Sequence, residues 1–158
     1  MLIEKVISGG QVGADQAGLS AARFYGIPTG GYAPKGYITA DGPNTALKYL
    51  YGLEEIEGSY KERTWMNVHA ADITIRLAVD FTSPGEKCTL NAILSYSKPF
   101  IDIPLQKAPT YIDETVNWIL KNDFKVVNIA GNSQGKLGYD IFSLSYSFLF
   151  YLFAHFTP

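Results

Sequence analysis

The stretch VISGGQVGADQAGLSAA, residues 6–22, carries the pattern that decides the fold. An apolar piece ends at Ser8, three glycines follow within five positions, and an alanine-rich segment with helical spacing comes next. A strand, a glycine turn and a helix in this order begin a βαβ unit, in which the chain crosses back to a parallel neighbouring strand. We therefore expect an α/β fold that extends outward from this corner.

The rest of the chain continues the alternation of strands and helices. The expected strands are 2–8, 27–32, 73–79, 99–104 and 125–130. The expected helices are 14–25 before Gly26, 59–72 with Ser59 and Glu62 as a capping box, 84–96, 111–120 introduced by Thr110, and 137–153. This order predicts a three-layer α/β sandwich: a mostly parallel Rossmann-like sheet of about five or more strands, with helices on both faces.

Residues 33–58 are the one region without a clean period over most of its length. A connection this long is uncommon unless it is functional or holds further structure, and 49–56 is a candidate edge strand. The chain has 158 residues, is 47 % apolar and shows no linker, so we expect a single Rossmann-like domain over residues 1–158.

Charge and composition exclude several classes of partner. The formal net charge is −2 and no run of five or more like charges occurs, so we expect neither nucleic acid nor membrane as the partner. The N-terminus lacks the pattern of a signal peptide, and Cys88 alone cannot form an internal disulfide, so a cytoplasmic location is expected. With only His69 and His155 beside that cysteine, no metal site is expected.

The C-terminal run at residues 141–156 is strongly apolar and aromatic. It is shorter than the roughly 20 residues that a membrane-spanning helix needs. We expect a buried or subunit-packing helix here, and hence a homo-oligomer.

The glycine corner is a candidate anion site. Ser8, Gly9, Gly10, Gln11 and Gly13 directly follow the first strand, where glycines bring peptide N–H groups close to a ligand at a helix N-terminus. The alternative is a tight turn without a ligand. No dinucleotide fingerprint is present, because a serine replaces its first glycine and no acidic residue follows the second strand; a Walker A loop is also absent.

Other candidate residues follow the remaining strands, and the carboxyl ends of parallel strands meet at one edge of the sheet. We predict a ligand site there that also contains Asp15, Gly30, Gly31, Lys35, Asp41, Ser83, Gly85, Thr89, Gly131 and Asn132. Arg63 and Asn67 lie four residues apart on one expected helix face, which either leans over this edge or is solvated.

Six motifs then occur in a recognisable order: ISGGQVGAD, GIPTGGYAPKGYITADGP, RTWMNV, the turn at 83–89, SKPF and VVNIAG. Together they resemble the family labelled putative molybdenum carrier proteins, a circularly permuted YpsA-like group in the nucleotide-sensing superfamily of the Lonely Guy-type proteins. The resemblance covers almost the whole chain. It implies a parallel α/β fold, a pocket at the glycine loops, and either molybdenum cofactor or a nucleotide as ligand.

The sequence departs from this resemblance at three places. Val12 replaces a usual threonine, and SPGEKCT replaces a Ser-Gly-Gly-Thr-like turn. In the Lonely Guy-type pattern P-G-G-x-G-T-x-x-E, laid on Pro84, the catalytic glutamate falls on Ala92. Since one general acid or base contributes about 10²–10⁴-fold in rate, a binding role is favoured over hydrolysis.

The sequence thus predicts a binding or carrier protein for a phosphate-containing, nucleotide-like or molybdopterin-type ligand. The peptide N–H groups of residues 9–13 are expected to hold it, with Lys35 and Arg63 as charge partners. The alternative is a nucleotide-processing hydrolase that uses a carboxylate at the same pocket, with Asp15 and Asp41 as candidates.

Overall fold

The computed structural model describes residues 2–157 and is organised around a five-stranded sheet of order β2-β1-β9-β7-β8, in which every pairing is parallel. The strands are β1 (Lys5–Ile7), β2 (Thr29–Gly30), β7 (Ile73–Ala78), β8 (Phe100–Pro104) and β9 (Val126–Gly131). The last strand of the chain, β9, lies between β1 and β7. The predicted parallel Rossmann-like sheet is confirmed.

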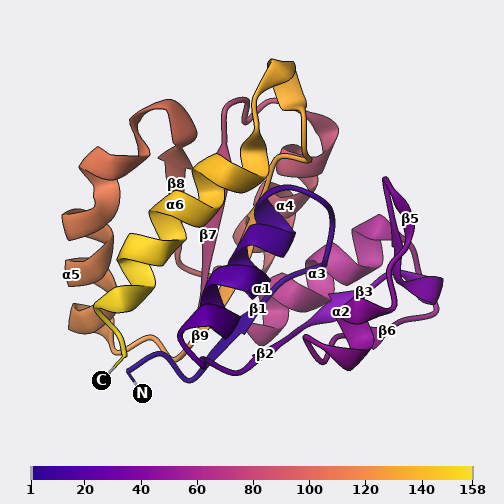
Figure 1. Ribbon diagram of the computed structural model, residues 1–158, viewed down its shortest axis with the longest axis horizontal. Helices are drawn as coiled ribbons and strands as arrows, with labels where there is room; N and C mark the ends of the chain where they lie inside the picture. The colour runs from indigo at the N-terminus through magenta and orange to yellow at the C-terminus, as the bar shows by residue number, and fades with distance from the viewer. Residues whose placement is uncertain (1, 158) are drawn as a thin grey trace.

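Helices cover both faces of this sheet, which gives three layers (Figure 1). On one face lie α1 (Ala14–Phe24) and α6 (Ile141–Ala154), with α5 (Ile112–Asn122) packed beside α6. On the other face α3 (Tyr60–Ala70) packs against α4 (Pro84–Tyr96).

The core follows from this layering. All six residues of β7 are buried, as expected for a central parallel strand with helices on both faces. Helix α1 approaches the sheet closely at Gly18, where an added Cβ would lie 2.7 Å from the Cβ of Ile129. A glycine at this position therefore sets the distance between α1 and β9, and so the position of the α1 N-terminus at the edge of the sheet.

The second expected strand, 27–32, is shorter than predicted. It splits into β2 and β3 (Tyr32–Ala33), because Gly31 has a φ of 123° and turns the chain out of the main sheet. Asn67 fixes the new direction, since its Oδ1 accepts from the Tyr32 N–H at 2.9 Å and its Nδ2 donates to the Tyr32 carbonyl at 3.0 Å.

The unassigned region at 33–58 forms a small appendage to the sheet. It contains β4 (Ile38–Thr39), β5 (Gly42–Pro43), α2 (Ala46–Tyr49) and β6 (Glu54–Glu55). The expected edge strand at 49–56 is wrong for most of its length: only β6 is a strand, and it pairs with β3 instead of extending the main sheet.

Helix starts were predicted with mixed success. The capping box of Ser59 and Glu62 is confirmed at α3. Thr110 does not cap α5, because its hydroxyl donates to the Lys107 carbonyl within a 3₁₀ segment, Leu105–Tyr111. The last helix begins at residue 141 and not at 137, because Asp140 caps it by accepting from the Ser143 N–H at 3.1 Å.

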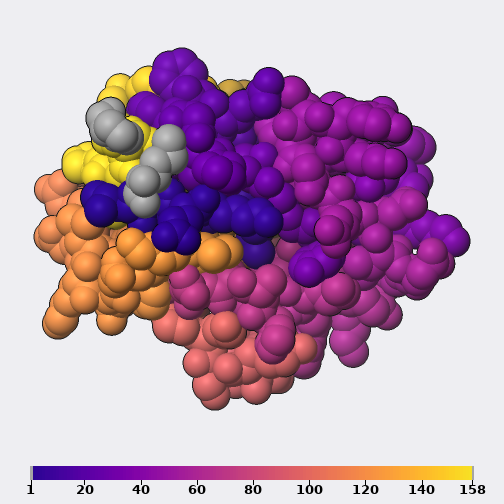
Figure 2. Space-filling view, turned by 90° about the horizontal axis from the view of Figure 1, so that it is seen from below, coloured from indigo at the N-terminus to yellow at the C-terminus, as the bar shows by residue number. Residues whose placement is uncertain are grey.

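The first and last described segments of the chain, indigo and yellow, lie side by side at the edge where the strands begin (Figures 1 and 2). There the Leu2 N–H donates to the Phe156 carbonyl at 3.3 Å. Within residues 2–157, none of the helices has the length and apolar character needed to cross a membrane.

Candidate functional site

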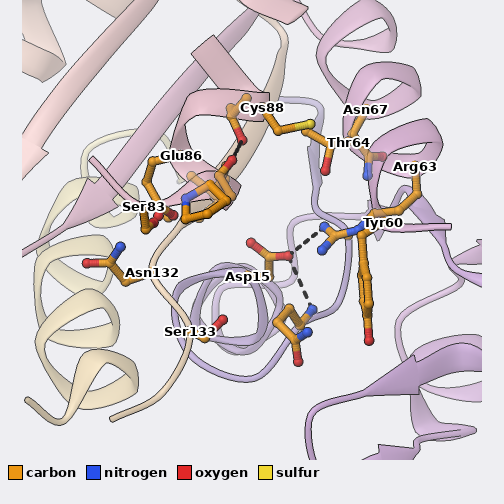
Figure 3. A pocket seen from close by; sticks show the side chains of 18 of the residues that line it. Asp15, Tyr60, Arg63, Thr64, Asn67, Ser83, Glu86, Cys88, Asn132 and Ser133 are labelled. Carbon is orange, nitrogen blue, oxygen red and sulfur yellow. Dashed lines mark hydrogen bonds and ion pairs between the residues drawn. The ribbon is translucent and has the colours of Figure 1, made fainter. Parts of the chain in front are cut away.

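A cavity of about 580 Å³ opens at the carboxyl edge of the sheet. Its walls come from the loop after β1, the start of α4, the loop after β9, and one face of α3 (Figure 3). Strand β1 leads through α1 to β2 on one side of the sheet, whereas β7 leads through α4 to β8 on the other side, so the direction of winding reverses between β1 and β7. Ligands of open parallel sheets bind at such a reversal, which makes this cavity the candidate site.

The structure brings ten of the predicted residues to this cavity and leaves seven outside its lining. Those that line it are Gly9, Gln11, Asp15, Arg63, Asn67, Ser83, Gly85, Thr89, Gly131 and Asn132. Those outside the lining are Ser8, Gly10, Gly13, Gly30, Gly31, Lys35 and Asp41.

The glycine corner already has anionic and polar acceptors of its own. The Gly10 N–H donates to Ser8 Oγ at 3.3 Å, and the Gln11 N–H donates to Asp15 Oδ2 at 3.2 Å. The Val12 N–H donates to Gln11 Oε1 at 3.0 Å. Three of the peptide groups that were expected to hold a phosphate are therefore satisfied from within, and the Asp15 carboxyl accepts from one of them.

Arg63 closes the corner from the side of α3. Its Nη1 donates to Asp15 Oδ2 at 3.0 Å, with 13 % of the Arg63 side chain and 6 % of the Asp15 side chain exposed (Figure 3). A Cβ added to Gly9 would overlap Nη1, so the guanidinium lies directly on the glycine backbone. On its other side the guanidinium faces the Tyr60 ring, with 5.6 Å from Cζ to the ring centroid. Arg63 is therefore held in one place before any ligand arrives.

Burial has the largest effect on the Asp15 carboxyl. It raises the pKa of Asp15, while the charge of Arg63 and the hydrogen bonds from Gln11, Arg63 and Gly9 oppose the rise. A carboxyl whose pKa is raised within a cavity is a frequent property of functional sites.

Glu86 is a second buried carboxyl on the same cavity, and sequence reasoning missed it. The residue is 5 % exposed, and no ion pair joins it to a described basic side chain. Burial raises the pKa of Glu86; its own peptide N–H lowers it, the nearby Asp15 raises it, and the Asn132 amide and Arg76 lower it further. Acidic residues are favoured in the first turn of a helix, and Glu86 lies in the first turn of α4. Nothing in the sequence therefore indicated that its side chain is buried.

Several predicted polar residues support the walls with their side chains. Asn67 is occupied by Tyr32, as described above, and Asn132 accepts from the Val79 N–H at 2.8 Å and donates to the Asp80 carbonyl at 2.9 Å. The Thr89 hydroxyl donates to the Gly85 carbonyl at 3.1 Å. These bonds fix the loops after β7 and β2 around the cavity.

Lys35 and Asp41 lie away from the cavity. Lys35 forms an exposed ion pair with Glu57 at 3.0 Å, and Asp41 occupies the turn between β4 and β5. Both belong to the appendage at 33–58, whose fold the sequence pattern did not predict. The cavity cations in addition to Arg63 are Lys61 and Lys136, and Lys136 lies 3.6 Å from Asp80.

The remaining lining residues were not predicted. They are Tyr60, Lys61, Thr64, Pro84, Glu86, Cys88, Asn128, Ile129, Ala130, Ser133 and Lys136. Helical spacing from Arg63 and Asn67 would have found Tyr60 and Thr64, which share their face of α3.

Ala92 lies outside the cavity lining, in an apolar cluster with Val68 and Ile93 between α3 and α4. A carboxylate at this position would be among apolar side chains. Across residues 2–157 the structure contains no group of three or more His, Cys, Asp or Glu side chains placed to hold a metal ion.

Comparison with known proteins identifies a matching family and a similar solved structure. The sequence model of the circularly permutated YpsA SLOG family matches residues 6–150. The crystal structure at 1.45 Å resolution of a protein titled "Putative molybdenum carrier protein", from Syntrophus aciditrophicus SB, is similar to this chain. The two are 30 % identical over 96 % of this chain and 95 % of that one, with a TM-score of 0.86. No curated protein matches the chain.

Proposed function

This chain belongs to the circularly permuted YpsA SLOG family, and from that premise we propose that it binds a phosphate-containing, nucleotide-like or molybdopterin-type ligand at the carboxyl edge of its sheet. The observation that carries the proposal is the cavity of about 580 Å³ with Arg63 fixed in its wall. Small-molecule sites have volumes of roughly 300–1,000 Å³, so a mononucleotide or a pterin of similar size fits.

The ligand's phosphate is expected to face the cavity cations. Arg63 uses Nη1 for Asp15 and its Nε is buried, whereas within the described chain no acceptor binds its Nη2, which leaves Nη2 for a ligand oxygen. Lys61 and Lys136 lie on the same cavity and take the part first assigned to Lys35. Because Asp15 and Gly9 fix the guanidinium, little side-chain entropy is lost when the phosphate binds.

A thermal-shift and calorimetry screen of nucleoside monophosphates, cyclic nucleotides and molybdopterin tests this proposal. A ligand at 100 times its Kd is expected to stabilise the fold by about 2.7 kcal/mol. Thr64→Phe fills the cavity and is expected to abolish the shift, while Met66→Phe on the same helix, outside the lining, is expected to keep it. Absence of a shift with every compound, or an equal shift in the Thr64→Phe protein, contradicts the proposal.

A second candidate function is nucleotide hydrolysis at the same pocket. The observation that favours it is the pair of buried carboxyls, Asp15 and Glu86, which share one cavity and both have a raised pKa. Two carboxyls in different surroundings can divide acid and base roles. Asp41, the earlier candidate beside Asp15, lies outside the cavity lining.

Incubation with nucleoside monophosphates distinguishes the two functions. Hydrolysis releases free base or phosphate, and Asp15→Asn is expected to slow this release by about 10²–10⁴-fold. Saturable binding without release of either product supports the binding role. Binding is the favoured proposal, because Ala92 and its apolar neighbours provide no carboxylate for the Lonely Guy-type mechanism.

A further inference from the structure

Glu86 is a buried carboxyl in the cavity wall that the ion pairs of the site do not explain. A carboxyl that is only 5 % exposed and has no ion pair with the described basic residues costs free energy when it ionises. Asp15, which is also buried, is compensated by Arg63, whereas Asp102, whose side chain is 35 % exposed, receives two hydrogen bonds from Arg76 at 2.7 Å each. A purely structural role does not require this carboxyl, since the Glu86 peptide carbonyl already accepts from Arg76 Nη1 at 2.9 Å.

Glu86 already accepts from its own peptide N–H and from the Asn132 amide, and since a carboxylate has about four acceptor positions, some remain for a ligand in the cavity. The residue lies in the first turn of α4, where the helix dipole favours negative charge. It lines the cavity on the α4 wall, while Arg63 lies on the α3 wall (Figure 3). A carboxylate accepts through two oxygens side by side, and a ligand that presents two parallel N–H donors complements both.

We propose that Glu86 selects the ligand, by accepting two hydrogen bonds from a ring N–H and an adjacent exocyclic amino group. This edge is the 2-amino-4-oxopyrimidine edge that guanine nucleotides and pterins share. The inference rests on the proposed binding function and makes it more specific. A ligand held in this way places its heterocycle against α4 and leaves its phosphate for Arg63 on the opposite wall.

An adenine ring fits this site less well. Its corresponding edge has one N–H₂ donor beside a ring nitrogen acceptor, which would face a carboxylate oxygen. Adenine could pair with Glu86 in this way only if Glu86 were protonated. Hydrogen bonds to a neutral carboxyl are roughly half as strong as those to a carboxylate.

Matched ligands on the unaltered protein give the most direct test. Calorimetric titration with guanosine, inosine and adenosine monophosphates varies the heterocycle and keeps the phosphate. Removing the 2-amino group is expected to weaken binding about ten- to hundredfold, and adenosine monophosphate is expected to bind most weakly. For pterin ligands the corresponding comparison is between the affinities of pterin and lumazine, in which an oxo group replaces the 2-amino group.

Glu86→Gln is the matched variant. Glutamine keeps the size but replaces one acceptor with an amide donor, so the preference for guanosine over inosine monophosphate is expected to fall to within about threefold. Equal affinities of the unaltered protein for guanosine and inosine monophosphates and for pterin and lumazine, or a preference for adenine, overturn the inference and leave the binding proposal standing. Absence of binding by all five compounds overturns both.

Discussion

Replacing Arg63 by methionine isolates the role of the ion pair in the glycine corner. Methionine keeps much of the apolar stem but leaves the Asp15 carboxylate without its cation, at 5 % exposure. Removing one partner of a buried pair costs about 3–5 kcal/mol, because the remaining charge stays buried. For a chain of this length each kcal/mol lowers Tm by about 2–4 °C, so a fall of about 6–20 °C is expected at neutral pH.

The destabilisation caused by Arg63→Met is predicted to depend on pH. Burial raises the pKa of Asp15 in the folded state above its unfolded value of roughly 3.9, so the folded state binds the proton more tightly. The contribution of Asp15 to the free energy of unfolding is fully present below the pKa that Asp15 has in the unfolded state. It is lost as the pH rises through the pKa that Asp15 has in the folded state. Without Arg63 the folded pKa rises further, so the cost of Arg63→Met is expected to grow from mild acid to neutral pH.

Urea denaturation at mild acid and at neutral pH completes the test. It compares the unaltered protein, Arg63→Met, Asp15→Asn and the double variant. Asp15→Asn keeps an acceptor for the Gln11 N–H but removes the charge, and the double variant Asp15→Asn with Arg63→Met removes both charges. The cost of Arg63→Met is expected to be smaller in the Asp15→Asn background by at least about 1 kcal/mol. An equal cost in both backgrounds, or at both pH values, refutes the role assigned to the pair.

Three further predictions concern the fold and assembly. Gly9→Ala is expected to cost about 1–3 kcal/mol in urea denaturation, because its Cβ overlaps the Arg63 guanidinium. Gly85→Ala, where nothing lies within 4 Å of an added Cβ, is the matched control, and equal costs contradict the overlap. Asp72→Ala is expected to lower the free energy of unfolding by about 2–4 kcal/mol, since Asp72 Oδ2 accepts from the N–H groups of Lys125 and Val126 at 2.8 Å each. Asp72→Asn keeps an acceptor and is expected to cost less. A larger cost for Asp72→Asn than for Asp72→Ala contradicts this role. Light scattering is expected to give a mass above the 17.4 kDa of one chain, and Tyr151→Lys, on the exposed aromatic side of α6, is expected to lower it; a monomeric mass contradicts the homo-oligomer.

The layers and the order of the main elements were predictable because they follow from local patterns. The stretch at residues 6–22 contains most of β1, the glycine corner and most of α1, and the mostly apolar, β-branched sequence of β7 is typical of a buried strand. Residues 33–58 were not predictable in this way. Their strands contain two residues each and pair within the appendage. Neither the two-residue period of a strand nor the 3.6-residue period of a helix therefore extends over enough residues to be recognised.

The site was predictable in its place and only partly in its chemistry. The rule that ligands bind at the carboxyl edge brought the correct loops together, and helical spacing placed Arg63 on the cavity wall. That Asp15 is itself the acceptor for the corner's peptide groups depends on the geometry of the folded loop. Glu86 was missed because burial of a side chain in the first turn of a helix depends on the tertiary contacts around that turn.

A crystal structure of the protein grown with the tightest-binding compound of the nucleotide and pterin panel tests the central claim most directly. The ligand is expected in the cavity between α3 and α4, with its phosphate at Arg63 and its heterocycle against Glu86. A ligand bound elsewhere, with Arg63 and Glu86 both free of it, would contradict the assignment of this cavity as the binding site.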